Sequence, residues 1–364
     1  MDGVGDYARR LASELRVLGH ECHLLALSDG RTAEILREAE GTIPALRLPA
    51  TLPWDARVRA AREYVRAMAP DWISWQVVPY GFDPRGLSFG LGRRLREISG
   101  DTPVQIMFHE IWIGAARDAL FKHKLVGQVQ RGIIGDLLRQ LAPRVIHTHM
   151  PLYRHLLEKL GHPVGILPLF GNVPLAEADP TWLQRQRPDL AGQADRWVFA
   201  LFGSIHPEWD VDDFRQRSLA AAEKAGKKVL LVSIGRPGSA GEIKLRHLQQ
   251  DQNDAWQVLV LGQQPESEIS QCLFAADFGI ASSPPENVFK SGTVAAMIEH
   301  GLHVIVTRAP AIYRSCPTEI LTAGMRNIVT DFNLAGLGKT KAGSFLPGIA
   351  RQFLDDLAAA PATS

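Results

Sequence analysis

Short apolar runs alternate with stretches of helical period along almost the whole chain, and this alternation limits the folds open to it. Val104–Phe108 and Lys228–Ile234 are predominantly apolar runs, as expected of strands that are buried on both faces. Residues 125–141 instead show the period of a helix. Strands joined by helices at this spacing predict an α/β protein with parallel, doubly wound sheets.

The alternation occurs twice, and a polar, proline-containing stretch separates the two parts. The strands predicted in the first part are 21–27, 72–77, 104–108, 144–149 and 164–170, and those in the second are 197–202, 228–234, 256–261, 278–282, 303–307 and 327–330. The helices predicted after the first one are 55–68, 125–141, 152–160, 212–224, 266–275, 291–300 and 346–357. Residues 171–195 are interpreted as a linker, so two consecutive Rossmann-like domains are expected.

Composition sets limits on partners and location. The 364 residues are enough for two domains, and 46% hydrophobic with 22% charged residues is typical of a globular protein. The formal net charge of +1 gives no electrostatic reason to expect a nucleic-acid partner. Three scattered cysteines suit a reducing compartment, so a cytoplasmic location is expected. No apolar run has membrane-spanning length, and peripheral contact with the inner face of a membrane stays open.

The first helical pattern begins directly after Gly3-Val4-Gly5 and ends at Gly19. A glycine-rich loop followed by a helix and a strand is half of a nucleotide-binding fold unit. Such a loop normally follows a strand, and no strand pattern precedes Gly3. We therefore expect that the first sheet lacks its central strand or receives it from residues upstream of Met1.

The stretch 282–301 has the chemistry of an anion-binding turn. An apolar run is followed by a proline-rich turn, by Lys290-Ser291-Gly292-Thr293, and by an apolar helix that stops at Gly301. Ser291 is a natural N-cap and Gly301 a natural C-terminal stop. A helix start of this kind exposes backbone N–H groups and a positive dipole end, which favours a phosphate, and Lys290 adds a charge. An ordinary capped helix is the alternative.

Four motifs together resemble those of GT-B glycosyltransferases of the family 4-like group. They are 3–12 with 18–22, Phe202-Gly203-Ser204-Ile205, 260–270 with 275–279, and 282–301 with the strand after it. The resemblance rests on their order and spacing over nearly the whole chain. It implies a GT-B architecture, in which two Rossmann-like domains with parallel sheets face each other across a cleft. Residues 1–172 would bind the acceptor, 173–345 the nucleotide-sugar donor, and 346–364 would form a helix that packs back on the first domain.

The resemblance also implies a reaction and its residues. The reaction would be retaining, metal-independent transfer of a hexose from a nucleotide sugar, with no further cofactor, to an unknown saccharide, lipid-linked or small-molecule acceptor. The residues expected on the donor side are Gly203, Ser204, Gly262, Glu286, Ser291, Gly292 and Thr293, and those on the acceptor side are Gly3, Val4 and Gly5.

Three side chains are catalytic candidates. Charge builds on the departing diphosphate, so a nearby cation lowers the barrier. Lys290 is the first candidate and Arg236, at a strand end, the second, with a solvated loop arginine as the alternative for Arg236. His109 ends a strand and resembles the histidine that faces the sugar in the family, where a neutral imidazole can accept a proton. A buried structural histidine is the alternative for His109.

Departures from the family pattern keep two other functions open. Val288 and Ala296 occupy the positions of the family's usual pair of glutamates, and Glu286 is the nearest substitute for the first. One alternative is a catalytically degenerate GT-B protein that acts as a binding or scaffold partner. The other is a nucleotide-sugar epimerase, which would need an additional carboxylate pair at the sugar.

Two further patterns are interpreted as non-functional. His147, His149 and His155 lie close in sequence, but no carboxylate or cysteine is spaced to complete a metal site. Residues 336–340 imitate a phosphate-binding loop, but Asn333 stands where its first glycine is needed.

Overall fold

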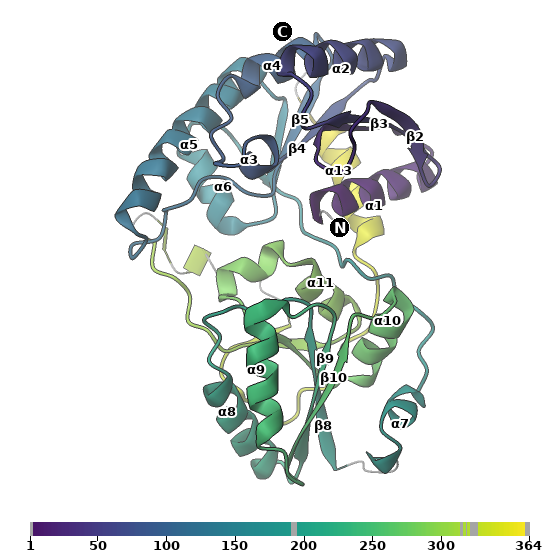
Figure 1. Ribbon diagram of the computed structural model, residues 1–364, viewed down its shortest axis with the longest axis vertical. Coiled ribbons are helices and arrows are strands. Elements are labelled where there is room, and N and C mark those ends of the chain that lie inside the picture. The colour runs from purple at the N-terminus through teal and green to yellow at the C-terminus, as the bar shows by residue number, and fades with distance from the viewer. Residues whose placement is uncertain (1–2, 191–194, 314–315, 318, 321–326, 361–364) are drawn as a thin grey trace. The chain divides into compact units, whose positions relative to one another are not determined.

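The computed structural model describes residues 3–190, 195–313, 316–317, 319–320 and 327–360, and the chain forms two compact units (Figure 1). Unit 1 comprises Met1–Pro168, Ile312–Ile320 and Leu346–Ser364, and unit 2 comprises Leu169–Ala311 and Leu321–Phe345. The chain thus passes into unit 2 after Pro168 rather than after residue 172. The return of Ile312–Ile320 to unit 1 has no counterpart in the sequence pattern.

The strands of unit 1 form two sheets. One has the order β1-β3-β2, with β1 (Leu24–Asp29), β2 (Leu36–Glu40) and β3 (Ile43–Pro49). The other has the order β4-β5-β6-β7, all parallel, with β4 (Ile73–Val77), β5 (Val104–Phe108), β6 (Val145–Thr148) and β7 (Gly165–Ile166). No strand among the described residues joins the two sheets. The antiparallel strand β2 was not predicted, because it is largely exposed and carries no apolar run.

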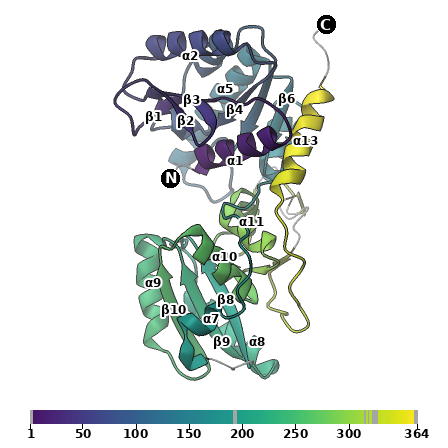
Figure 2. The same cartoon turned by 90° about the vertical axis from the view of Figure 1, so that its right-hand side faces the viewer.

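The helices of unit 1 are α1 (Gly3–Val17), α2 (Trp54–Met68), α3 (Pro79–Phe82), α4 (Leu91–Ser99), α5 (Phe121–Leu141), α6 (Pro151–Glu158) and α13 (Leu346–Ala358). The stretch from Gly3 to Gly5, predicted as a loop, belongs to the first turn of α1. The last helix, α13, contacts α1 and runs beside β6 (Figure 2). Its buried face includes Ile349 and Phe353, as its sequence period predicts.

Unit 2 contains one parallel sheet of six strands in the order β10-β9-β8-β11-β12-β13. The strands are β8 (Arg196–Phe202), β9 (Lys228–Ile234), β10 (Trp256–Gly262), β11 (Phe278–Ala281), β12 (His303–Val306) and β13 (Ile328–Val329). All six strands predicted for this part of the chain are present. The prediction of two Rossmann-like α/β units with parallel sheets is confirmed.

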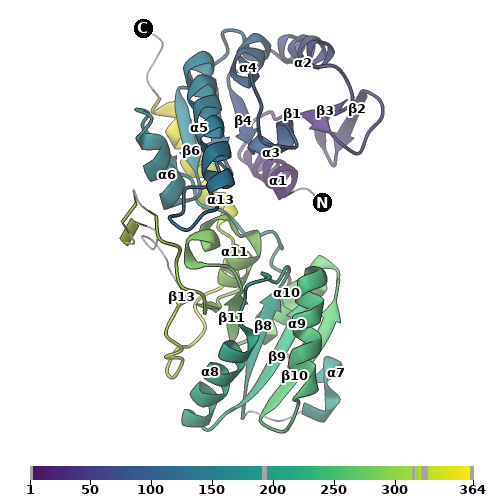
Figure 3. The ribbon, with the colours of Figure 1, turned by 60° about the vertical axis from the view of Figure 1, so that its left-hand side comes forward.

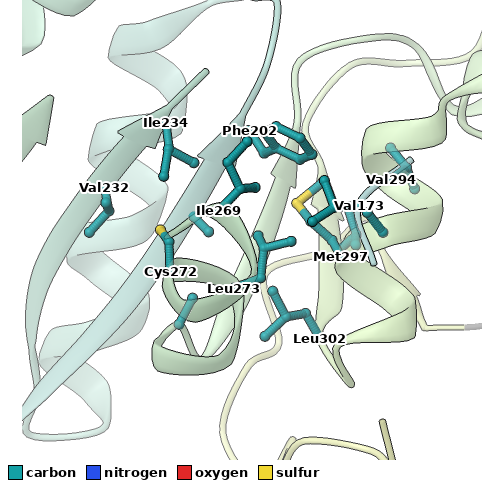
Figure 4. Packing of buried hydrophobic residues seen from close by; sticks show 14 of the residues in the cluster. Val173, Phe202, Val232, Ile234, Ile269, Cys272, Leu273, Val294, Met297 and Leu302 are labelled. Atoms are coloured by element: carbon teal, nitrogen blue, oxygen red, sulfur yellow. The ribbon is translucent and has the colours of Figure 1, made fainter. Parts of the chain in front are cut away.

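Helices cover both faces of this sheet, and β8 shows why. Val198 and Ala200 point into a core shared with α10 (Glu266–Ala275) and α11 (Gly292–Glu299), part of which is seen in Figure 4. Phe199 and Leu201 point into the opposite core, shared with α8 (Val211–Lys224) and α9 (Gly238–Gln250). Figure 3 shows α8 and α9 beside β8, β9 and β10. Helix α9 was not predicted, because its first turn holds glycine and serine, which favour helices weakly.

The described part of the stretch predicted as a linker, residues 171–190 and 195, belongs to unit 2 and packs onto its core through Val173 and Trp182. It contains α7 (Trp182–Gln186) and a short 3-10 turn, η1 (Pro188–Leu190). Trp182 is only 1% exposed, and its indole N–H donates to Glu268 Oε2 at 2.7 Å. The interpretation of 171–195 as a linker alone is therefore wrong. Across the described residues, no helix has both the length and the apolar character needed to cross a membrane.

Candidate functional site

Three glycine turns stand side by side at the carboxyl edge of the unit 2 sheet. Gly203, Gly235 and Gly262 end or follow β8, β9 and β10, with φ of +86°, +96° and +65°. The Gly203 N–H donates to the Ile234 carbonyl at 2.9 Å, and the Gly235 N–H donates to the Gly262 carbonyl at 2.7 Å. Glycine adopts this left-handed conformation at little cost, whereas other residues are strained in it. The carboxyl edge of such a sheet is where open α/β folds bind ligands.

The start of α11 lies against the first of these turns. A Cβ atom added to Gly203 would lie 3.0 Å from Thr293 Cγ2. Ser291 caps the helix, because its Oγ accepts the Val294 N–H at 3.3 Å, and the same oxygen lies 2.9 Å from Thr293 Oγ1. The predicted N-cap at Ser291 is confirmed. The structure thus brings together two of the donor-side motifs, the loop after β8 and the capped helix start.

Gly292 allows another backbone segment to approach the helix start. A Cβ atom at Gly292 would lie 3.2 Å from Asn172 Cβ, and the Asn172 N–H donates to the Gly292 carbonyl at 3.3 Å. Asn172 was not predicted as a site residue, because it falls in the stretch interpreted as a linker. The first N–H groups of a helix have no acceptor within the helix, so those at the start of α11 remain donors for another group even though Asn172 lies close by.

Cationic and acidic side chains lie around the same edge. Arg236 is exposed, and its Nε–H donates to Gln263 Oε1 at 2.8 Å, which joins the turns after β9 and β10. Lys290 is partly buried at the end of the 3-10 turn η2 (Pro285–Lys290), directly before Ser291. Glu286, in the same turn, is 2% exposed, and its Oε1 accepts the Ala311 N–H at 3.1 Å. Glu286 therefore holds the segment after β12 in place.

Arg308, which follows β12, was missed in the sequence. Its Nη1 donates to His206 Nδ1 at 2.7 Å, and its Nη2 lies 2.5 Å from Glu208 Oε2. Burial lowers the pKa of His206, and the charge of Arg308 lowers it further, so that His206 stays neutral and accepts this hydrogen bond. The sheet order places Arg308 two strands from β8, at the same edge as Gly203. A cation directly after a predicted strand was the signal available in the sequence.

In unit 1, His109 follows β5 and is buried, at 9% exposure. Its Nε2 lies 2.8 Å from Gln76 Oε1, and its Nδ1 lies 3.1 Å from His149 Nε2. The Tyr7 ring stands edge-on to the His109 ring, with 4.9 Å between centroids. Burial and the neighbouring His149 hold the pKa of His109 well below its ordinary value, so the imidazole is neutral near pH 7. Both ring nitrogens have protein partners, and a sugar hydroxyl would have to replace one of them.

The remaining predicted site residues are those near the start of α1 and Ser204. Gly3, Val4 and Gly5 precede Tyr7 in α1, so the contact between Tyr7 and His109 brings the start of this helix to the histidine pair. Ser204 is exposed next to Gly203. No group of three His, Cys, Asp or Glu side chains suited to a metal ion occurs in the part of the chain that the structure describes. No described helix follows residues 336–340 before α13, unlike a true phosphate-binding loop.

Comparisons with known proteins bear on the fold. No protein-family model matches the sequence, and no curated protein matches it. Among solved structures, HepE from Anabaena, in complex with UDP and glucose, aligns with a TM-score of 0.50 at 14% identity, covering 87% of this chain and 86% of that one. UDP-GlcNAc 2-epimerase from Methanocaldococcus jannaschii aligns with a TM-score of 0.50 at 9% identity, covering 97% and 96%. The α/β fold with two Rossmann-like units, of the GT-B class, is confirmed.

Proposed function

We propose that this protein is a glycosyltransferase that moves a hexose from a nucleotide sugar, bound by unit 2, to an acceptor bound by unit 1. The observation that carries the proposal is the contact between the loop at Gly203 and the capped helix start at Thr293. This contact joins a strand-end glycine turn to the first N–H groups of a helix, the combination that binds diphosphates in α/β folds.

The same edge supplies what the chemistry requires. Bond cleavage at the sugar leaves negative charge on the diphosphate, and fixed donors that already point there lower the barrier. The N–H groups at Gly292 and Thr293 are those donors, whereas the Ser291 N–H, also expected to be one, already donates to the Val288 carbonyl at 3.2 Å. Lys290, Arg236 and Arg308 supply positive charge in this part of unit 2. Since this set can bind a diphosphate without a metal ion, we propose metal-independent transfer, with the Gly262 turn beside the nucleobase. Retention of the anomeric configuration is proposed on the resemblance to family 4-like GT-B enzymes alone.

The first experiment tests the donor site by calorimetry with UDP, ADP and GDP. Gly292→Val should weaken the tightest of these about ten- to a hundredfold, the equivalent of ~1.5–3 kcal/mol, because the side chain meets Asn172 and displaces the N–H groups. Thr293→Ala should cost less. Gly132→Val, at a helical position of unit 1 with open space around the glycine, is the matched control. Equal affinities of wild type and Gly292→Val would remove this site from consideration.

A turnover assay then separates the proposed transferase from its alternatives. A transferase releases nucleoside diphosphate with formation of a glycoside. An epimerase instead changes a sugar stereocentre within the nucleotide sugar, and the similarity to a 2-epimerase makes this the second candidate. Tight binding of the nucleotide sugar without turnover of any acceptor would favour a binding or scaffold protein.

Helix α5 bears on the nature of the acceptor. Phe121, Leu125 and Val129 recur at every fourth position and are 75%, 54% and 45% exposed. Lys122 and Lys124 lie between them, and no acidic residue occurs before Asp136 in this helix. Exposed apolar side chains with flanking cations bind anionic membrane surfaces, which favours a lipid-linked acceptor. Vesicles that contain anionic lipid should carry the wild type into the pellet and leave Leu125→Ser in the supernatant. A wild type that stays in the supernatant would contradict membrane contact, and equal sedimentation of both proteins would exclude this face of α5 as the contact.

A further inference from the structure

A continuous chain of polar contacts at hydrogen-bond distance runs through unit 1 from the His109 pair to the C-terminal helix. On one side of His109 the links are His109–Gln76 (2.8 Å), Gln76–Ser74 (2.7 Å), Ser74–Gln105 (2.5 Å), Gln105–His147 (3.2 Å) and His147–Asp356 (3.0 Å). On the other side they are His109–His149 (3.1 Å) and the bond of His149 to the Leu167 carbonyl (2.8 Å). The chain therefore has seven links and ends at a carboxylate and a carbonyl.

Both ends of the chain can only accept hydrogen bonds. The Asp356 carboxylate requires a proton on His147 Nε2, and the Leu167 carbonyl requires one on His149 Nδ1. A neutral imidazole carries a single N–H. In the neutral forms of these two histidines, His147 Nδ1 and His149 Nε2 are thus bare acceptors.

The carboxylate end sets the direction of the links as far as His109. His147 Nδ1 accepts from the Gln105 amide, whose oxygen accepts from the Ser74 hydroxyl. The Ser74 oxygen accepts from the Gln76 amide, whose oxygen faces His109 Nε2. His109 must then carry its proton on Nε2, and its Nδ1 is bare.

The two directions meet between the histidines of the pair. Neutral His109 Nδ1 and His149 Nε2 face each other with two lone pairs across 3.1 Å. Each of the six side chains between the two ends can donate one hydrogen bond along the chain, but the chain has seven links. The link without a proton is the contact between His109 and His149. An added proton there completes the chain, and the positive charge is balanced by the Asp356 carboxylate at the other end.

We propose that Asp356 is a positioning residue that fixes His109 in its Nε2–H tautomer, and that the contact between His109 and His149 is a site for one additional proton. The titratable groups that face this contact are the buried hydroxyl of Tyr7 on α1 and His147, while Asp356 closes the chain on α13. Burial lowers the pKa of His149 to about 4 and also lowers that of His109, so the site is empty at neutral pH and fills in acid. The inference stands apart from the proposed transferase activity.

Substitution of Asp356 by asparagine should reverse the chain. The asparagine amide can donate to His147 Nε2, which moves the His147 proton to Nδ1 and turns both glutamine amides. Gln76 then donates to His109 Nε2, and His109 Nδ1–H donates to His149. All seven hydrogen bonds then form without an added proton. In this variant His109 is therefore protonated on Nδ1, and the contact between His109 and His149 no longer lacks a proton.

Nitrogen-15 NMR of the histidine side chains tests this inference in the intact protein. In the wild type, His109 should show a protonated Nε2 and a bare Nδ1, and Asp356→Asn should exchange the two. The pair should also titrate at a lower pH in Asp356→Asn, by about one unit, the size of a typical effect of one neighbouring charge or hydrogen bond. His109→Gln identifies the signals. A wild-type His109 protonated on Nδ1, or an unchanged tautomer in Asp356→Asn, would overturn the proposal.

Two control variants separate the chain from a general effect of charge. Asp355→Asn removes the same charge from the adjacent, exposed position of α13 and should leave the His109 tautomer as in wild type. Ser74 is the exposed link, so Ser74→Ala cuts the chain without leaving a cavity. In the Ser74→Ala background, Asp356→Asn should no longer change His109. A change of equal size in either control would show that Asp356 does not act through the chain.

Discussion

Gly203 and Thr293 are so close that the Cβ atom missing from the glycine would lie 3.0 Å from Thr293 Cγ2. The contact joins the loop after β8 to the first turn of α11, across a sheet in which β11 lies next to β8. A side chain at position 203 would require the Thr293 methyl group to give way by a few tenths of an ångström. The geometry of the proposed diphosphate site therefore depends on this glycine.

Gly203→Ala should weaken nucleotide binding as well as stability. An alanine at φ of +86° costs ~1–2 kcal/mol in backbone strain, and its methyl group also presses on Thr293. Gly161→Ala is the matched control, because Gly161 has φ of +89° and open space. Thermal melting should show a loss of stability in both variants, and calorimetry should show weaker nucleoside diphosphate binding only in Gly203→Ala.

A second substitution separates strain from contact at this position. Thr293→Ser removes the methyl group that an alanine at 203 would meet. In the Gly203→Ala background it should restore part of the nucleotide affinity and none of the loss due to backbone strain. If Gly161→Ala weakens nucleotide binding as much as Gly203→Ala, the contact has no specific role.

Arg308 and Arg236 should differ in what their removal does to His206. Each of Arg308→Gln and Arg236→Gln should weaken nucleoside diphosphate binding, by about ten- to a hundredfold if its guanidinium bonds the phosphates. Only Arg308→Gln should raise the pKa of His206, because Arg308 donates to His206 and lowers that pKa. Proton NMR titration of His206 measures the shift. Unchanged nucleotide affinity in both variants would exclude these cations from the donor site.

Most strands buried on both faces were predictable from the sequence, and β3 is the exception. The β9 bounds agree with prediction at both ends, because all its residues after Lys228 are buried and apolar or small. The capped start of α11 was also predictable, since Ser291 is a local signal. By contrast, three of the five residues of β2 are charged and the strand is largely exposed, and α9 begins at glycine and serine, so neither element was predicted.

The partners of the site residues depend on tertiary packing, and local patterns do not carry that information. His147 and Asp356, which hydrogen-bond at 3.0 Å, are 209 positions apart in the chain. His109 was identified from its place at a strand end, but nothing near it in sequence indicated that Gln76 and His149 occupy its two ring nitrogens. Arg308 follows a predicted strand in the same way as His109 and could have been identified by the same rule.

Trp182 should contribute strongly to the stability of unit 2. Its side chain is 1% exposed, and its indole N–H bonds Glu268 Oε2 at 2.7 Å. Trp182→Ala should cost ~3–5 kcal/mol through the cavity, and Trp182→Phe should cost less, because most of the buried ring is kept. Urea unfolding followed by circular dichroism measures both. A flexible linker would instead tolerate either substitution, so a loss below about 1 kcal/mol in Trp182→Ala would contradict the packing described for α7.

The stability of the protein should fall in mild acid, in part because His300 is buried as a neutral group. Its Nδ1–H donates to the Ala296 carbonyl at 2.7 Å, and its Nε2 accepts from the Ser270 hydroxyl at 2.8 Å. Burial lowers the pKa of His300. Above the ordinary histidine value of about 6.5, His300 is neutral in both the folded and the unfolded protein and adds no pH dependence. Below that value the unfolded chain binds a proton that the folded protein does not, so stability falls as the pH falls toward the folded pKa.

The free energy of unfolding, measured in urea from pH 7.5 to pH 5, should therefore decrease more steeply in wild type than in His300→Gln, by up to ~1.4 kcal/mol per pH unit. The slopes of unfolding free energy against pH are compared, and not the free energies themselves, because the glutamine also changes stability by an amount that does not depend on pH. Ser270→Ala should give an intermediate slope, since the hydroxyl stabilises the neutral imidazole by donating to Nε2. The other buried histidines contribute equally to all three proteins and cancel. Equal slopes in wild type and His300→Gln would mean that His300 is protonated as readily in the folded chain as in the unfolded one.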